Sequence, residues 1–168
     1  HADMLFFTQT GKLFQLKAYE IPPASRTSKG QAVVNFLNLP PHERVAAVLS
    51  IPDLKGFRFV VMVTTRGVIK KVAIEEFKNV RRSGLIAMRV KSGDSLQWVV
   101  PSSGTDEIIL TTETGQAIRC KEKDVRPMGR NAAGVRGMRL KGQDTIVGMD
   151  VVKTGAALKN DQLLIVTR

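Results

Sequence analysis

Short apolar segments recur along the chain, and each one runs through threonine into a glycine. The three clearest copies are Leu5–Gly11, Val61–Gly67 and Ile109–Gly115. The glycines lie about 50 residues apart, a spacing typical of repeated supersecondary units. The hydrophobic pattern therefore predicts a chain built from repeats.

The likeness of the units continues beyond each of these glycines. An apolar or cysteine side chain recurs at Leu16, Val72 and Cys120. An acidic side chain recurs at Glu20, Glu76 and Asp124. Because active sites are usually single and asymmetric, we interpret an acidic residue present in every unit as a hydrogen-bonding group at a turn or strand end.

A second glycine begins the later half of each unit. The segment Gly84–Val90 matches Gly134–Leu140, and Gly30–Phe36 is a weaker first copy. A further apolar strand follows each copy, at Val45–Ile51, Leu96–Val100 and Ile146–Val152. Each unit thus offers about four short segments rich in valine and isoleucine, separated by turn sequences.

Four strands in about 50 residues are typical of a propeller blade, so we predict an all-β, propeller-like repeat of four-stranded blades. No window shows sustained helical periodicity, and stretches such as Ala73–Lys78 are expected to be connectors. The predicted repeats span about 5–57, 58–106 and 107–161 of a single domain covering 1–168, and Leu163–Arg168 starts a fourth at 162–168. We therefore expect about three blades and one strand of a partial ring, excised from a longer protein.

The residue inventory argues against an enzyme. The sequence holds no nucleophile elbow and no phosphate-binding loop, and its one cysteine and two histidines form no metal-ligand cluster. We expect no catalytic residue, no metal and no cofactor. Tyr19 and Cys120 are interpreted as packing residues, with the cysteine buried and inert.

The sequence also gives no sign of a membrane-spanning or export segment. A single cysteine cannot form an internal disulfide, which fits a reducing cytoplasm. We therefore expect a cytoplasmic protein without a membrane partner.

The charge of the chain is strongly positive. Its 26 lysine and arginine residues against 15 acidic residues give a net charge of +11 and an isoelectric point near 10.2. The basic residues gather at corresponding places, just before each second glycine and along the strand beyond each first glycine. The expected DNA-binding residues are Arg26, Lys29, Lys70, Lys71, Arg81, Arg82, Arg119, Lys121, Lys123, Arg126, Arg130 and Arg136. Repeated cations along one rim would suit the phosphates of a polyanion.

Duplex DNA is favoured over single strands, since only 5% of the residues are aromatic and few could stack on unpaired bases. A merely solvated basic face is one alternative, and it would hold more intermixed acidic residues. A propeller that binds a protein partner would need an apolar or mixed patch instead. A propeller that binds a small molecule would gather polar and acidic residues in a central channel, which the repeats do not show.

Two stretches carry a family resemblance. The segments Lys17–Gly30 and Arg126–Leu140 resemble the C-terminal domain of the DNA gyrase A subunit. The resemblance implies a β-pinwheel, in which neighbouring blades exchange strands, that wraps duplex DNA around its outer edge. It also implies a bacterial, nucleoid-associated, ATP-dependent type II topoisomerase as the parent, in which the partners are the ATPase subunit and the remaining domains of the gyrase A subunit. The nucleophilic tyrosine of that family lies in another domain, so the resemblance implies that this chain is not itself catalytic.

The chain departs from the family at one motif. The gyrase heptapeptide Gln-Arg-Arg-Gly-Gly-Lys-Gly is missing, and the first aligned loop, Ala24–Gly30, keeps only Arg26, Lys29 and Gly30 of it. Either the blade that bears the motif precedes His1, or the chain is the related topoisomerase IV subunit. The amino-acid sequences of the first and third copies favour gyrase.

Overall fold

The computed structural model describes residues 2–77, 80–81 and 83–154. The strands are β1 (Asp3–Thr8), β2 (Lys12–Lys17), β3 (Val45–Ser50), β4 (Phe59–Thr64), β5 (Val68–Ala73), β6 (Leu85–Ile86), β7 (Leu96–Ser102), β8 (Glu107–Thr112), β9 (Ala117–Lys121), β10 (Val135–Arg136) and β11 (Ile146–Val152). The 3-10 turns are η1 (Ala18–Glu20), η2 (Val33–Asn35), η3 (Ile51–Leu54), η4 (Ile74–Phe77) and η5 (Glu122–Asp124). The expectation of an all-β fold with one-turn connectors is confirmed, and no helix in the described part of the chain is long and apolar enough to cross a membrane.

The strands form three antiparallel sheets that follow one plan. Their orders are β3-β1-β2-β6, β7-β4-β5-β10 and β11-β8-β9. In each sheet a hairpin closes at the threonine-to-glycine turn, and a later strand of the same unit pairs with the outer side of its first strand. These are the strands that the apolar segments predicted.

The short strands β6 and β10 pair outside their own unit. β6 belongs to the second unit but pairs with β2 of the first, and β10 belongs to the third unit but pairs with β5 of the second. Each four-stranded sheet is therefore completed by the unit that follows it. This is the strand exchange between blades that the family resemblance implied.

The first glycine of a unit is required where the next unit crosses it. The carbonyl of Gly11 accepts hydrogen bonds from the backbone N–H groups of Ala87 and Met88, and the carbonyl of Gly67 accepts them from Gly137 and Met138. A Cβ atom on Gly11 would stand 2.1 Å from the Met88 carbonyl oxygen, and its φ of +83° already disfavours other residues. The repeated glycine thus marks the junction of two units.

In each of these turns a threonine donates a hydrogen bond to an acidic side chain from later in the same unit. Thr10 Oγ1 donates to Glu43 at 2.6 Å in the first unit, and Thr114 Oγ1 donates to Asp144 at 2.6 Å in the third. In the second unit Thr65 Oγ1 donates to Asp94 at 3.0 Å. Each hairpin is thereby tied to the segment that leads into the last strand of its unit.

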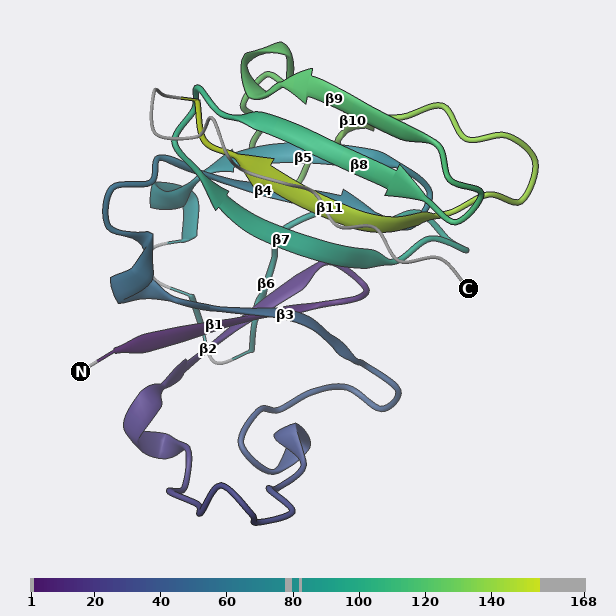
Figure 1. The fold of residues 1–168 in the computed structure, drawn as a ribbon. Helices are drawn as coiled ribbons and strands as arrows, with labels where there is room; N and C mark the ends of the chain where they lie inside the picture. Colours follow the sequence, from purple (N-terminus) through teal and green to yellow (C-terminus); the bar gives the residue numbers. More distant parts are fainter. Residues whose placement is uncertain (1, 78–79, 82, 155–168) are drawn as a thin grey trace.

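Two apolar layers separate the three sheets. Leu5, Phe7 and Leu13 of the first sheet pack with Met62 and Val72 of the second. On the opposite face of the middle sheet a second cluster holds Val61, Val63 and Ile69 with Ile108 and Leu110. Because alternate side chains of a strand point to opposite faces, β4 contributes to both layers. Figure 1 shows the first sheet (β1, β2, β3) on one side of the other two.

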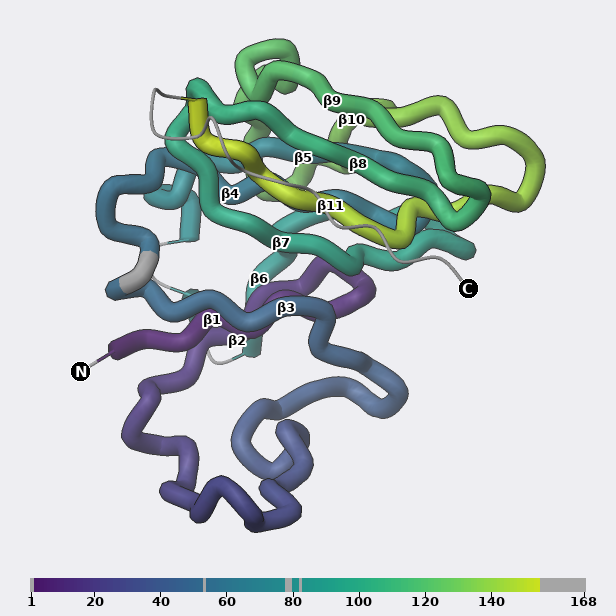
Figure 2. Tube along the Cα trace, in the orientation of Figure 1, coloured from purple at the N-terminus to yellow at the C-terminus, as the bar shows by residue number. Residues whose placement is uncertain are grey.

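One predicted segment does not form a strand. The region Gly30–Phe36 holds only η2, and residues 19–32 are all exposed, in a loop that extends away from the sheets (Figure 2). The matching segments form strands because each lies against the second strand of the preceding unit. In the described structure Gly30–Phe36 lies in none of the three sheets. The predicted fourth copy at Leu163–Arg168 lies outside the described residues.

Candidate nucleic-acid interface

The first predicted basic loop is fully exposed. Arg26 and Lys29 lie on the long loop between β2 and η2, where Ser28 Oγ donates to the Ser25 carbonyl at 2.8 Å. Arg26 lies inside this turn and Lys29 directly follows it, and both side chains are exposed. Both side chains can reach a phosphate in solution.

The second predicted loop is described only in part. Arg81 is exposed, and its carbonyl accepts a hydrogen bond from Gly84 N at 2.9 Å. Arg82 lies outside the described residues. Arg81 thus leads directly into the second glycine, as the sequence predicted.

The third predicted loop is fastened to the middle sheet. Met128 N donates to the Lys71 carbonyl at 2.8 Å, and Arg130 Nε lies 3.4 Å from a carboxylate oxygen of Glu76. Arg126 and Arg136 are exposed, whereas Arg130 is half-buried. Among the described residues no carboxylate pairs with Arg126 or Arg136, whereas the charge of Arg130 is shared with Glu76.

The cations after β8 lie along the open edge of the third sheet. Arg119, Lys121 and Lys123 are exposed on β9 and η5. The guanidinium of Arg119 pairs with Glu107, with its Nε 2.6 Å from the carboxylate. Lys121 and Lys123 are therefore better placed for an anion than Arg119 is.

The expectation that Lys70 and Lys71 contact DNA is wrong, because both side chains are buried. Lys70 is 0% exposed and Lys71 is 3% exposed. They lie on β5, an inner strand of the middle sheet, and other sheets cover both of its faces. Alternation therefore leaves neither lysine a solvent face. Their ammonium groups bind protein atoms instead.

Lys71 belongs to a buried polar network between the second and third units. Its Nζ donates to the Glu122 carbonyl at 2.9 Å and lies 3.6 Å from Glu122 Oε1 and 4.9 Å from the centre of the Phe59 ring. The Glu122 side chain, 0% exposed, also accepts hydrogen bonds from Ser102 Oγ, Gly104 N and Asp106 N. Each buried charge is thus matched by hydrogen bonds and an opposite charge.

The structure brings together a set of cations that sequence reasoning missed. A groove of about 570 Å³ runs between the segments after β6 and before β10, and its charged lining residues are Arg66, Arg89, Lys91, Asp94 and Arg136. An adjoining depression shares Arg66 and Arg136 and adds Arg139. We call the two together the basic cleft. Of its cations, only Arg136 was among the expected DNA-binding residues.

The cations of the basic cleft are not neutralised by neighbours. Within the described part of the chain, no carboxylate pairs with Arg66, Arg89, Lys91 or Arg136. Two acidic residues line the cleft, Asp94 and Asp144. Asp94 accepts hydrogen bonds from Thr65 Oγ1 and from the backbone of Arg66, and Asp144 accepts them from Thr114. The cleft therefore carries an excess of positive charge at the junction of two units.

A signal for this cleft was present in the sequence. The second glycine is followed by Arg-Val-Lys at 89–91 in one unit and by Arg-Leu-Lys at 139–141 in the next. The repeat could therefore have pointed to these residues. What the sequence could not show is that Arg66, from a hairpin turn of the second unit, joins them.

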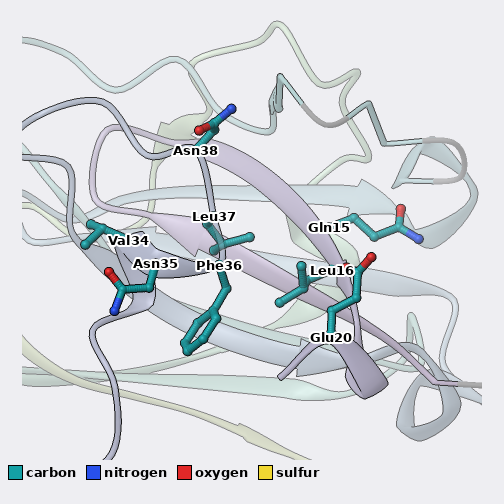
Figure 3. A pocket seen from close by; sticks show the side chains of 8 residues that line it. All are labelled: Gln15, Leu16, Glu20, Val34, Asn35, Phe36, Leu37 and Asn38. Carbon is teal, nitrogen blue, oxygen red and sulfur yellow. The ribbon is translucent and has the colours of Figure 1, made fainter. Parts of the chain in front are cut away.

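A second groove, of about 330 Å³, lies beside η1 and η2 and does not suit an anion. Figure 3 shows the apolar lining side chains Leu16, Val34, Phe36 and Leu37, and the only charged residue among those that line the groove is Glu20. Its apolar side chains continue the small cluster around Phe14 on the outer face of the first sheet. We assign no ligand to this groove.

Two packing interpretations have different outcomes. Cys120 is half-buried beside the second apolar layer, and burial raises the pKa of its thiol, which is consistent with an unreactive cysteine. Tyr19 is 68% exposed, so the interpretation of this residue as a packing side chain is wrong. It lies in η1, at the start of the exposed loop, rather than on a covered strand.

Comparison with known proteins agrees with this architecture. A family described as the DNA gyrase C-terminal domain, a β-propeller, matches residues 2–52, 58–103 and 106–153, one stretch for each sheet. The DNA gyrase A subunit of Clostridium acetobutylicum is 49% identical over 137 residues, which cover 82% of this chain and 16% of that protein. Its counterpart from Staphylococcus aureus is 38% identical over 168 residues, covering 99% of this chain and 19% of the relative.

Solved structures give the same result. The C-terminal domain of a DNA topoisomerase IV matches with a TM-score of 0.81 and 28% identity, over 91% of this chain and 48% of that one. A DNA gyrase A C-terminal domain matches with a TM-score of 0.74 and 26% identity, over the same shares. The chain spans less than a fifth of the length of the curated relatives it matches. With its three matched units and exchanged strands, the chain belongs to the DNA gyrase C-terminal domain family.

Proposed function

We propose that this chain is a non-catalytic module that binds duplex DNA through its phosphates and bends it. The observation that supports this function best is the basic cleft, where Arg66, Arg89, Lys91 and Arg136 form no ion pair with any described carboxylate. Clustered, unpaired cations bind polyanions by releasing the counterions condensed on them. Binding of this kind is strong at low salt and largely independent of base sequence.

The proposed contacts differ from the set expected from the sequence. Lys70 and Lys71 are removed because they are buried, and four cleft cations are added. The proposed set is Arg26, Lys29, Arg66, Arg81, Arg89, Lys91, Lys121, Lys123, Arg126, Arg136 and Arg139, with Arg119, Arg130 and Arg82 as further candidates. These residues come from all three units, so a duplex would have to pass from one unit to the next. Such a path favours bending.

The family suggests a role for that bend. We propose that the parent protein is a bacterial DNA gyrase, in which the other domains of the same polypeptide and a separate ATPase subunit work together on DNA in the nucleoid. The module would hold a curved segment of duplex while other domains cut and pass strands. The family match and the relatives that are gyrase A subunits support this role.

A salt titration tests the binding. Arg89→Ala with Lys91→Ala removes two cleft cations, and Arg44→Ala with Lys55→Ala removes two exposed cations outside the cleft. The slope of log affinity against log salt should fall by about 2 in the cleft variant, at roughly 0.9 per phosphate contact, and much less in the control. Affinity that is flat with salt, or equal loss in both variants at equal stability, would contradict the proposal.

A second candidate, the topoisomerase IV counterpart, rests on the structural match to that enzyme's C-terminal domain and on the missing heptapeptide. Plasmid relaxation in the presence of the chain separates the two roles. A large linking-number change of constant sign per bound molecule would indicate wrapping, as a gyrase role requires. Binding without such a change would favour the counterpart, or a gyrase module whose missing motif lies elsewhere.

A further inference from the structure

Lys70 is a buried cation whose partners are backbone carbonyls from two different units. Its Nζ donates to the Ala87 carbonyl at 2.7 Å and to the Arg130 carbonyl at 2.5 Å. Ala87 follows β6 in the second unit, and Arg130 lies in the basic loop of the third unit. One ammonium group thus connects two segments that are 43 residues apart along the chain, at Ala87 and Arg130.

These two segments lead directly into the walls of the basic cleft. Ala87 immediately precedes Met88–Asp94, which forms one wall, and Arg130 precedes Ala133–Arg136, which forms the other. The walls are also joined by a hydrogen bond from Arg89 N to the Ala132 carbonyl at 3.2 Å. Lys70 therefore lies where the spacing of the walls is set.

Packing alone does not account for a lysine at this position. The same place in the first unit holds Phe14, and in the third it holds Ile118, both of which contribute to apolar clusters. Phe14 lies under Gly84 as Lys70 lies under Gly134. An apolar side chain stabilises such a site by burial, whereas a buried ammonium loses its hydration and depends on every hydrogen bond it makes.

We propose that Lys70 is a positioning residue for DNA binding: by holding the carbonyls of Ala87 and Arg130, it keeps the two walls of the basic cleft at the spacing at which their cations contact one duplex together. This inference rests on the proposed function, because the cleft must bind DNA for its spacing to matter. Lys70 itself touches no DNA, since it is buried.

Among the described residues, few charged groups lie around Lys70. Glu76 of η4 attracts its ammonium, and Glu76 is also paired with the Arg130 side chain. Arg89 lies two residues beyond Ala87, and Met62, the residue opposite on β4, carries no charge. Burial lowers the pKa of Lys70 to about 8 in spite of Glu76. The ammonium is therefore mostly charged at neutral pH and neutral in mild alkali.

Because the pKa of Lys70 is lowered, raising the pH should change the stability of the chain and its DNA affinity in opposite directions. Because the pKa is lower in the folded state than in the unfolded one, Lys70 opposes folding below about pH 8, and this penalty fades as the pH rises towards 10.5. Stability from this group should therefore increase in alkali. If Lys70 positions the cleft, DNA affinity should fall over the same range, because a neutral amine holds two carbonyls less strongly than an ammonium does.

The test compares this chain with its Lys70→Met variant, which keeps the length of the side chain and removes the charge. Binding to a mixed-sequence duplex and thermal unfolding are measured from about pH 7 to about pH 9.5. At neutral pH the variant should bind about three- to tenfold more weakly while remaining folded. The affinity of the wild-type chain should decline through about pH 8, and that of Lys70→Met should change less.

Limited proteolysis provides a structural readout. Trypsin cleavage after Arg130 should be faster in Lys70→Met than in the wild-type chain, when each rate is normalised to cleavage after the exposed Lys55. Lys12→Met, which removes a lysine that lies near Glu43 outside the cleft, is the matched control and should change neither rate nor pH profile.

The outcomes distinguish the two proposals. If the wild-type chain shows no salt-dependent binding to duplex DNA, the proposed function fails. If it binds but Lys70→Met binds equally well with the same pH profile, Lys70 does not position the cleft. If Lys70→Met does not fold, the wild-type pH profile still decides, because affinity that rises together with stability in alkali would overturn the inference.

Discussion

The edges of the first and second sheets are built on the same backbone plan but filled with different side chains. At both edges a short strand from the next unit adds to the second strand of the hairpin, and the first glycine accepts two N–H groups from that unit. Under the second glycine lies Phe14 at one edge and Lys70 at the other. The first edge is therefore apolar, and the second is held by buried cations.

The difference shows which features the repeat requires and which it leaves free. Glycines at the crossings and paired backbone groups occur at both edges, because close approach and hydrogen bonding depend on the backbone. The buried side chains vary, since any group that fills the space and satisfies its polar atoms suffices. The polar filling occurs at the edge that forms the basic cleft.

Replacing Phe14 should cause the largest loss of stability. This side chain is 2% exposed and packs with Phe6, Leu16 and Leu37. Phe14→Ala should lower the free energy of unfolding by about 4 kcal/mol, because it leaves a cavity in the first sheet's outer cluster. Denaturant unfolding would measure it. A loss below about 1 kcal/mol would mean that the first edge does not depend on apolar filling.

Loss of one charge from the buried Lys71–Glu122 pair should lower stability nearly as much, and removal of both charges should restore much of it. Glu122→Ala leaves the ammonium of Lys71 without its opposite charge and should lower the free energy of unfolding by about 3 kcal/mol. Lys71→Met together with Glu122→Leu removes both charges and should recover much of that loss. Denaturant unfolding of both variants tests this. If the double variant is less stable than Glu122→Ala, the network contributes more than compensation of charge.

Two glycine variants separate the effect of close packing between units from the effect of backbone conformation. Gly134→Ala places a Cβ 2.6 Å from the Ile69 carbonyl oxygen at a φ of +95°, and should cost about 2 kcal/mol. Gly115 has a φ of +82° but no atom within 4 Å of its Cβ position, so Gly115→Ala should cost only about 1 kcal/mol. Thermal unfolding compares the two. Equal losses would show that backbone conformation, and not close approach, requires glycine at Gly134.

The smallest expected effect is on the stability of the chain at acidic pH. Hydrogen bonding from Thr114 lowers the pKa of Asp144, so its contribution to stability is present above the ordinary carboxyl pKa and is lost as the pH falls through the folded-state value. Asp144→Asn should therefore flatten the decline of unfolding temperature in acid and reduce stability at neutral pH. An unchanged acid profile would mean that this turn does not depend on the charge.

The sequence alone determined the repeat and most of its strands. The apolar segments, the turn threonines and the paired glycines recur with the period of the units, because every unit must make the same hairpin and meet its neighbour in the same way. The repeated Arg-Val-Lys and Arg-Leu-Lys segments were visible as well. Local pattern is enough where the physical requirement is local.

Only the tertiary structure decided which cations are free. Lys70 and Lys71 read as surface residues of a strand, yet the neighbouring sheets cover both faces of β5 and bury them. Arg66 joins the basic cleft because its hairpin turn meets segments from two units. Gly30–Phe36 matches two strands in sequence but forms none, since a two-residue strand exists only where another unit offers it an edge. Burial and pairing between units depend on contacts distant in sequence, and no local pattern contains them.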